Sequence, residues 1–196
     1  MVVTGSLQFL APSLALHLKM FGYTPDFISL CFCIPCLLYA GLSPFMYLLT
    51  EKLPKRSVIF CGVILLTIGN FLVGQSEVLG LSAEADADLV LFGLCVIGMS
   101  AAMIAIPVMP ECLESIEERV DFNFDPEHLN NEISGFFVSF TGVGETLGPI
   151  ASSILNNYYG FTRAQEYYAS FLMCFALLYF FLGGGFFLFS FSKTEK

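Results

Sequence analysis

The stretch ISGFFVSFTGVGETLGPIASSILNNY, residues 133–158, decides the fold. It is long enough to cross a bilayer core, which takes about 20 predominantly apolar residues in a helix. Its only charged side chain is Glu145. Backbone groups in lipid must be paired internally, and the apolar residues do not alternate as in a membrane strand. The stretch is therefore predicted to be a transmembrane helix.

Five further apolar runs of similar length occur along the chain. Together the predicted helices span about 1–20, 27–49, 57–75, 89–110, 133–158 and 167–192. The sequence thus predicts an all-α polytopic membrane protein, with residues 1–196 forming a single six-helix unit in a lipid bilayer.

The composition supports this class and excludes others. Hydrophobic residues make up 56% of the chain and charged residues only 13%, against about 25% charged residues in soluble domains. The net charge of −9, with only 8 Lys and Arg residues, argues against a nucleic-acid partner, which needs a basic surface. No cofactor motif is present.

The cysteines do not predict a metal site. Cys31, Cys33 and Cys36 spell C-x-C-x-x-C, but at about 100° per residue Cys31 points away from the other two on a helix. Buried thiols in apolar runs behave as small hydrophobic groups.

The basic residues between the runs predict the orientation. One side of the membrane holds six of them and the other only two, Lys19 and Arg163. The six are Lys52, Lys55, Arg56, Arg119, Lys193 and Lys196. The positive-inside rule therefore places the loops 50–56 and 111–132 and the C-terminus in the cytoplasm. Loop 111–132 is strongly acidic; we interpret it as a solvated surface, and the alternative is a vestibule that attracts cations.

Prolines divide the runs into two groups. They occur in 1–20, 27–49, 89–110 and 133–158, but not in 57–75 or 167–192. Proline inside a spanning helix is tolerated where protein or water satisfies the freed backbone groups. The proline-containing runs are thus expected to line an interior and the other two to face lipid, in a three-plus-three pattern.

Glu145 lies on a polar stripe of its predicted helix. At helical spacing the stripe comprises Ser134, Val138, Thr141, Glu145, Gly148, Ser152 and Asn156. An acid at the bilayer midplane costs about 2.5–3.5 kcal/mol on insertion scales, so intramembrane acids commonly mark ion or substrate paths. We interpret Glu145 as a group that binds a proton or a cation. The alternative is a structural hydrogen bond from the protonated acid to a neighbouring helix.

The residues beside Glu145 predict a packing motif. Gly144 and Gly148 are spaced so that another helix can approach closely. Pro149 removes a backbone hydrogen bond and is expected to kink the helix near Gly144.

Polar residues on other runs are further candidates for the path. Gln8 lies in the first run, and Tyr39 and Ser43 lie in the second. His17 is interpreted as an interfacial residue, with a proton relay as the alternative. Asn70 is expected to join two helices through a hydrogen bond.

Two motifs resemble the major facilitator superfamily. Residues 47–56, YLLTEKLPKR, resemble the family's loop motif G-x-L-x-D-[RK]-x-G-[RK]-[RK] through Glu51, Lys52, Lys55 and Arg56. The pattern Gly144-x-x-x-Gly148-Pro149-x-x-Ser152 is similar to the family's antiporter motif. Residues 9–25 further resemble the C-terminal half of vesicular amine or polyamine transporter-like members.

The resemblance implies half of a twelve-span secondary transporter. It implies a C-terminal half that works with a missing N-terminal six-helix half, and a small solute moved by alternating access. Proton-coupled antiport of an organic cation is the most specific function implied, and the chain is expected to be a fragment, an incomplete gene product or a degenerate copy. The alternative function is a non-transporting scaffold or subunit that packs a partner on the glycine seam. An enzyme is not expected, because His17 and His128 fall on opposite sides and no nucleophile–base pair is present.

Overall fold

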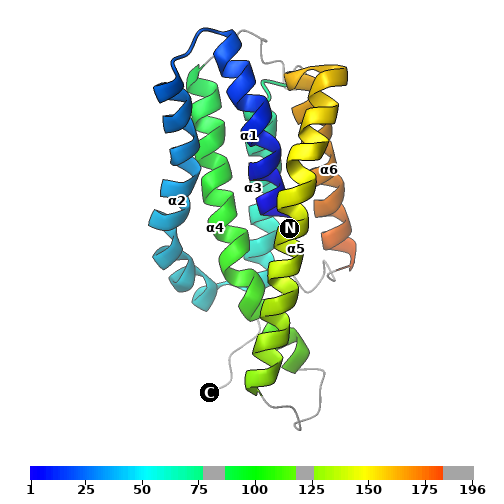
Figure 1. Ribbon diagram of the computed structural model, residues 1–196. Coiled ribbons are helices and arrows are strands. Elements are labelled where there is room, and N and C mark those ends of the chain that lie inside the picture. Colours follow the sequence, from blue (N-terminus) through cyan, green and yellow to red (C-terminus); the bar gives the residue numbers. More distant parts are fainter. Residues whose placement is uncertain (77–86, 118–125, 183–196) are drawn as a thin grey trace.

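The computed structural model describes residues 1–76, 87–117 and 126–182, and its regular elements in these ranges are all helices. They are α1 (Val2–Met20), α2 (Pro25–Lys52), α3 (Lys55–Val73), α4 (Ala87–Glu117), α5 (Pro126–Tyr159) and α6 (Phe161–Leu182). The helices run side by side along one long axis (Figure 1). The prediction of an all-α protein is confirmed.

Two helices extend beyond the predicted runs. Helix α4 continues to Glu117 and α5 begins at Pro126, so the described ends of the predicted loop 111–132 are helical. Hydrophobicity located the apolar middle of these helices but not their polar ends, where Glu111 and Glu114 of α4 pair with basic residues. The predicted end of the last run, 183–192, lies outside the described residues.

Short turns connect α1 to α2 and α5 to α6. The Thr24 side chain accepts a hydrogen bond from the Phe27 N–H at 3.4 Å and caps α2, whose first residue is Pro25. A single residue, Gly160, separates α5 from α6, and its φ of +78° is a backbone conformation that favours glycine. Such tight connections keep α5 and α6 antiparallel neighbours.

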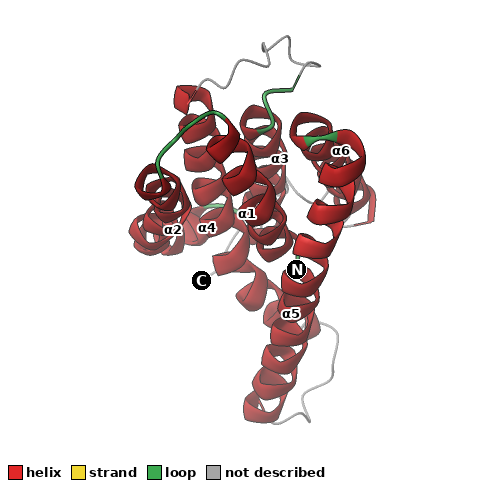
Figure 2. Ribbon diagram, turned by 45° about the horizontal axis from the view of Figure 1, so that its top comes forward, coloured by secondary structure: helices red, strands yellow, loops and turns green. Residues whose placement is uncertain are grey.

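The core forms where α3 and α4 pack together and α1 closes over them (Figure 2). Its buried members include Leu10, Leu14, Leu66, Leu94 and Ile97. Helix α2 packs chiefly on α4, α5 on α1, and α6 on α3. Of the apolar window in each helix, 50% is buried in α3 but only 11% in α2. Helices α4 and α6 thus cover two sides of α3, and the expectation that α3 is an outer, lipid-facing helix stays a prediction.

Small residues allow α4 to pack closely on α2 and on α3. A Cβ on Gly98 of α4 would stand 2.7 Å from the Pro35 Cα of α2, and a Cβ on Gly69 of α3 would stand 2.7 Å from Ile97 of α4. Close backbone approach of this kind is the usual way in which helices associate in lipid.

Four helices are long and apolar enough to cross a membrane by length and composition: α2, α3, α4 and α6. Helices α1 and α5 fall short of this measure among the described residues. They are the two helices that pack on each other through the polar and glycine-rich stretch around Glu145.

Candidate functional site

The contact between α1 and α5, here called the α1–α5 seam, centres on three glycines. A Cβ on Gly144 would stand 2.5 Å from the Met1 carbonyl oxygen, and a Cβ on Gly148 would stand 2.8 Å from the Gly5 carbonyl oxygen. Neither position has room for a side chain, since the obstacles are backbone atoms. The two glycines of the motif thus bring the backbones of α1 and α5 together.

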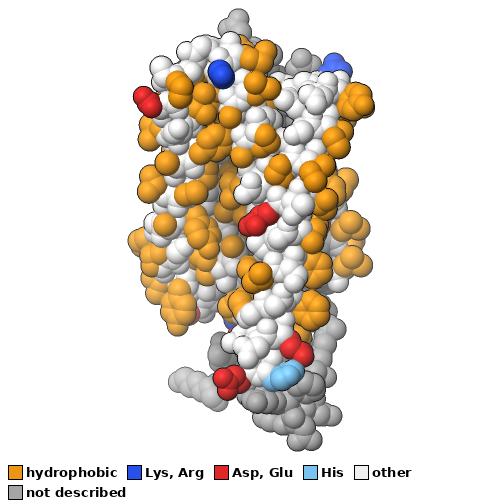
Figure 3. All heavy atoms as spheres, viewed as in Figure 1, with side chains coloured by type: hydrophobic (Ala, Val, Ile, Leu, Met, Phe, Trp, Pro, Cys, Tyr) orange, Lys and Arg blue, Asp and Glu red, His pale blue; other side chains and the backbone are white. Residues whose placement is uncertain are grey.

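Glu145 lies on α5 between these two glycines, and its side chain is exposed. It makes no hydrogen bond or ion pair with any residue in the described ranges. On the face of the molecule drawn in Figure 3, apolar side chains cover much of the bundle, while acidic groups and a histidine gather at the lower end, over α5. The Met1 α-amino group interacts with Glu145 electrostatically. A carboxylate placed inside a membrane is costly unless a proton, a solute or another group offsets its charge.

Two of the predicted path residues lie beside Glu145. Thr141 is half-buried one turn away on α5, and its backbone carbonyl accepts a hydrogen bond from the Thr4 hydroxyl at 3.5 Å. Gln8 is exposed on α1, and its Cβ is 3.1 Å from the position of a Cβ on Gly148. Gln8, Thr141 and Glu145 therefore follow one side of the seam.

The other two predicted path residues are elsewhere. Tyr39 and Ser43 lie on α2, which packs chiefly on α4, and the Ser43 hydroxyl donates to the Tyr39 carbonyl oxygen of its own helix at 2.7 Å. The seam lies on the far side of α4 from them (Figure 1). Within the described residues they are not part of one site with Glu145.

The polar stripe on α5 divides between two environments. Gly148 and Ser152 are buried against the bundle, whereas Val138 and Glu145 are exposed. The Ser152 hydroxyl has no hydrogen-bond partner among the described residues. Helix α5 is continuous through Pro149, and the kink expected near Gly144 stays a prediction.

A buried polar contact joins α1 to α3. The Ser6 hydroxyl donates to the Asn70 Oδ1 at 3.2 Å and accepts from the Asn70 Nδ2 at 2.9 Å, and both side chains are fully buried. The expectation that Asn70 joins two helices is confirmed.

A second buried polar contact joins α1 to α6. The fully buried Gln165 donates to the Ser13 hydroxyl at 3.4 Å. Sequence reasoning did not single out Ser6 or Gln165. The sequence feature that could have indicated these buried contacts is the spacing of Ser6 and Ser13, which are seven residues apart and share one face of α1.

His17 lies near the end of α1, where its ring stacks on Phe161 of α6 at a centroid distance of 4.1 Å. Its Nε2 atom is buried and has no hydrogen-bond partner in the described part of the chain. The aromatic contact places His17 at the end of the bundle near the α5–α6 turn.

Two ion pairs tie the α2–α3 turn to the end of α4. Lys55 pairs with Glu114, and Arg56 pairs with Glu111. Arg56 Nη2 also donates to the Ser115 hydroxyl at 3.0 Å, and that hydroxyl donates to Glu111 at 3.2 Å. The basic half of the loop motif thus binds α4. Glu51 and Lys52 remain exposed on α2.

These ion pairs revise the interpretation of the acidic segment. Glu111 and Glu114 were expected in a solvated loop, but they lie on a helix and hold the neighbouring turn. Hydropathy could not find this pairing, because the partners are 55 and 59 residues apart in the sequence.

Comparison with known proteins extends these observations. The chain is 30% identical to the MFS-type transporter SLC18B1 of Homo sapiens over 201 aligned residues, which cover 99% of this chain and 41% of the relative. It is 32% identical to the Rattus norvegicus protein of the same name over 168 residues, covering 83% of this chain and 35% of the relative. No family profile matches the chain, and no solved structure matches it.

The helices and these relatives together indicate an integral, multi-pass membrane protein that is similar to curated transporters. The resemblance to the major facilitator superfamily is confirmed by homology over almost the whole chain. The chain spans about two fifths of the length of the curated relatives that it matches.

Proposed function

We propose that the chain forms six membrane spans, arranged three plus three, as the C-terminal half of a secondary transporter. A second six-helix unit completes the protein. Two observations support this proposal: the chain covers only 41% of its human relative, and the apolar window of α2 is only 11% buried within the chain. The orientation that we propose places the C-terminus and the α2–α3 turn in the cytoplasm, as the basic residues predict.

The proposed activity is alternating-access transport of a small solute, in the form of proton-coupled antiport of an organic cation. The observation that carries it is the position of Glu145, an exposed acid that makes no hydrogen bond or ion pair in the described chain, between the two glycines at which α5 packs closely on α1. A carboxylate there can hold a proton in one state and the positive group of the solute in the other. Gln8 and Thr141 would supply hydrogen bonds to the same solute.

The seam itself fits a moving part. Backbone contacts between glycines contain few interlocking side chains, so one helix can tilt against the other with little steric cost. Transporters of this class rock one helix bundle against another around a midplane site. Gly144 and Gly148 would be the pivot of α5 on α1.

The alternative function, a non-transporting scaffold that packs a partner on the glycine seam, has less support than the transport proposal. It assigned the glycine seam to an outside partner, but α1 of the same chain already covers Gly144 and Gly148. A partner would have to bind another surface.

The test replaces Glu145 in the complete protein. Uptake of a radiolabelled monoamine and a radiolabelled polyamine into proteoliposomes is measured with and without an imposed pH gradient. Glu145→Gln keeps the shape but removes the charge, and should abolish uptake driven by the pH gradient. Glu145→Asp should keep part of it.

The control is Asp26→Asn, which removes an exposed acid in the first turn of α2, outside the seam and outside both family motifs. It should leave gradient-driven uptake by reconstituted protein close to that of the wild type. Uptake by Glu145→Gln that is equally fast and equally dependent on the pH gradient would refute the proposed role of Glu145.

A further inference from the structure

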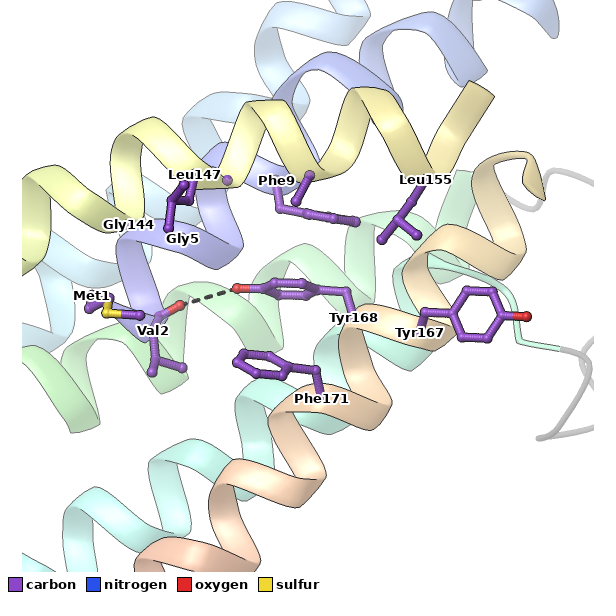
Figure 4. Close-up of a pocket in the computed structure, with 12 residues that line it drawn as sticks. Met1, Val2, Gly5, Phe9, Gly144, Leu147, Leu155, Tyr167, Tyr168 and Phe171 are labelled. Carbon is purple, nitrogen blue, oxygen red and sulfur yellow. Dashed lines mark hydrogen bonds between the residues drawn. The ribbon is translucent and has the colours of Figure 1, made fainter. Parts of the chain in front are cut away.

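An apolar cavity of about 360 Å³ lies between α1, α5 and α6, and the proposed transport path does not use it. Its walls include Val2 and Phe9 of α1, Leu147, Ala151 and Leu155 of α5, and Phe171 of α6. Figure 4 shows the rings of Phe9, Tyr168 and Phe171 standing between the helices. The volume lies within the range of about 300–1,000 Å³ that is typical of ligand sites.

The cavity offers almost no free polar group to a ligand. The Tyr168 hydroxyl already donates to the Val2 carbonyl oxygen at 3.5 Å, and the Tyr168 ring stacks on Phe9 at 4.3 Å. The ring of Tyr167 points away from the other lining residues (Figure 4). Cavities with such walls stay dry and take apolar ligands.

The cavity has the direction and depth of one bilayer leaflet. Leu155 lies close to the α5–α6 turn, and Gly144 lies 155 − 144 = 11 residues deeper on the same helix. At a rise of about 1.5 Å per residue this is about 16 Å, close to half of the roughly 30 Å hydrocarbon core. The side away from the bundle is open, since Leu147 and Phe171 are 54% and 55% exposed.

The outer end of the cavity matches the headgroup region of a membrane. Three exposed tyrosines, Tyr158, Tyr159 and Tyr167, surround the α5–α6 turn, and the rings of Tyr159 and Tyr167 meet edge to face at 5.1 Å. Tyrosine is enriched where the hydrocarbon meets the headgroups. Arg163 is exposed on the first turn of α6, at the same end.

We propose that this cavity binds one acyl chain of a membrane phospholipid from the leaflet on the side of the α5–α6 turn. The chain lies along α5 from Leu155 toward Gly144, and the phosphate lies at the level of Arg163. The bound chain fills the space beside the α1–α5 seam and packs against the helix that carries Glu145.

The test uses the complete protein in vesicles that contain a phosphatidylcholine with a photoreactive diazirine near the end of one acyl chain. After illumination, labelled positions are mapped by mass spectrometry. Label is expected on the lining residues of α5 and α6, above the level on exposed residues of α2. Ala151→Phe fills the cavity and should remove most of the label at Leu147 and Phe171.

The matched control is Ala40→Phe, the same change at an exposed position on α2 that does not line the cavity. Its labelling pattern should equal that of the wild type. Ala151→Leu serves as a second variant with a smaller added volume, and should lower the label to a lesser extent. Thermal unfolding of each variant in detergent shows that it is folded.

A second arm examines the headgroup end with a phosphatidylglycerol that carries the same diazirine. Arg163→Gln should weaken labelling by this anionic lipid more than labelling by phosphatidylcholine. Equal cavity label in the wild type and Ala151→Phe would overturn the proposal, as would label no higher in the cavity than on α2. Labelling by a diazirine fatty acid but by neither phospholipid would also overturn it. The labelling readout does not depend on solute uptake. The lipid proposal can therefore fail while the proposed antiport holds, and the antiport can fail while the lipid proposal holds.

Discussion

Gly148 of α5 lies so close to Gly5 of α1 that a Cβ on Gly148 would stand 2.8 Å from the Gly5 carbonyl oxygen. Real Cβ atoms essentially never come this close to another heavy atom. The relationship fixes how α5 sits on α1, and with it the position of the acid three residues earlier on the same helix.

The glycine contact predicts a specific sensitivity to one methyl group. Gly148→Ala should lower the thermal unfolding midpoint in detergent, because overpacking of a close contact costs about 1–3 kcal/mol. Gly142→Ala on the same helix is the matched control, since nothing lies within 4 Å of its added Cβ. That control should be neutral or slightly stabilising, because alanine favours helix over glycine by about 1 kcal/mol. Equal effects of the two substitutions would contradict the close packing.

The ion pairs at the α2–α3 turn predict two different coupling energies. The Arg56–Glu111 pair is partly buried and shares Ser115, whereas the side chain of Glu114 is 56% exposed. Exposed pairs contribute about 0.2–1 kcal/mol. A double-mutant cycle with Arg56→Gln and Glu111→Gln should therefore give a larger coupling than one with Lys55→Gln and Glu114→Gln. The ranking is read from unfolding midpoints, and the reverse order would argue against the observed network.

The buried contact between Ser6 and Asn70 predicts a measurable coupling between α1 and α3. Buried hydrogen bonds between membrane helices contribute about 0.6 kcal/mol on average and up to about 1.7 kcal/mol. The cycle Ser6→Ala with Asn70→Ala should give a value in this range. Ser29→Ala should be nearly neutral, because the exposed Ser29 hydroxyl donates to the Pro25 carbonyl oxygen of its own helix at 2.9 Å and so does not join two helices. Additive effects of Ser6→Ala and Asn70→Ala would show that the two side chains do not interact.

The proposed solute path predicts water near Glu145 but not on the other side of α5. Single cysteines at Thr141 and Phe140 are compared after the seven native cysteines have been replaced. In the complete protein, Thr141→Cys should react with a charged, water-soluble thiol reagent, because it lies beside Glu145. Phe140→Cys, at an apolar position that is 57% exposed, should react only with a lipid-soluble reagent. If both cysteines resist the water-soluble reagent, the path does not pass Thr141.

Much of this protein follows from its sequence. The apolar runs predict the helices because backbone groups in lipid have only one local way of being paired. The spacing of Gly144 and Gly148 predicts a face where another helix approaches, because residues four apart share a face of an α-helix. The family motifs predict the relationship that the curated transporters confirm.

Only the tertiary structure decides which helix meets which. The sequence indicates that Asn70 and the α5 glycines contact other helices, but their partners, Ser6 and Gly5, lie 64 and 143 residues away. It also does not predict that Glu111 pairs with Arg56 and Glu114 with Lys55, nor that α3 is more enclosed than α2. Periodicity records which side of a helix is polar or small, a local property, whereas the partner of that side depends on how all the helices pack at once.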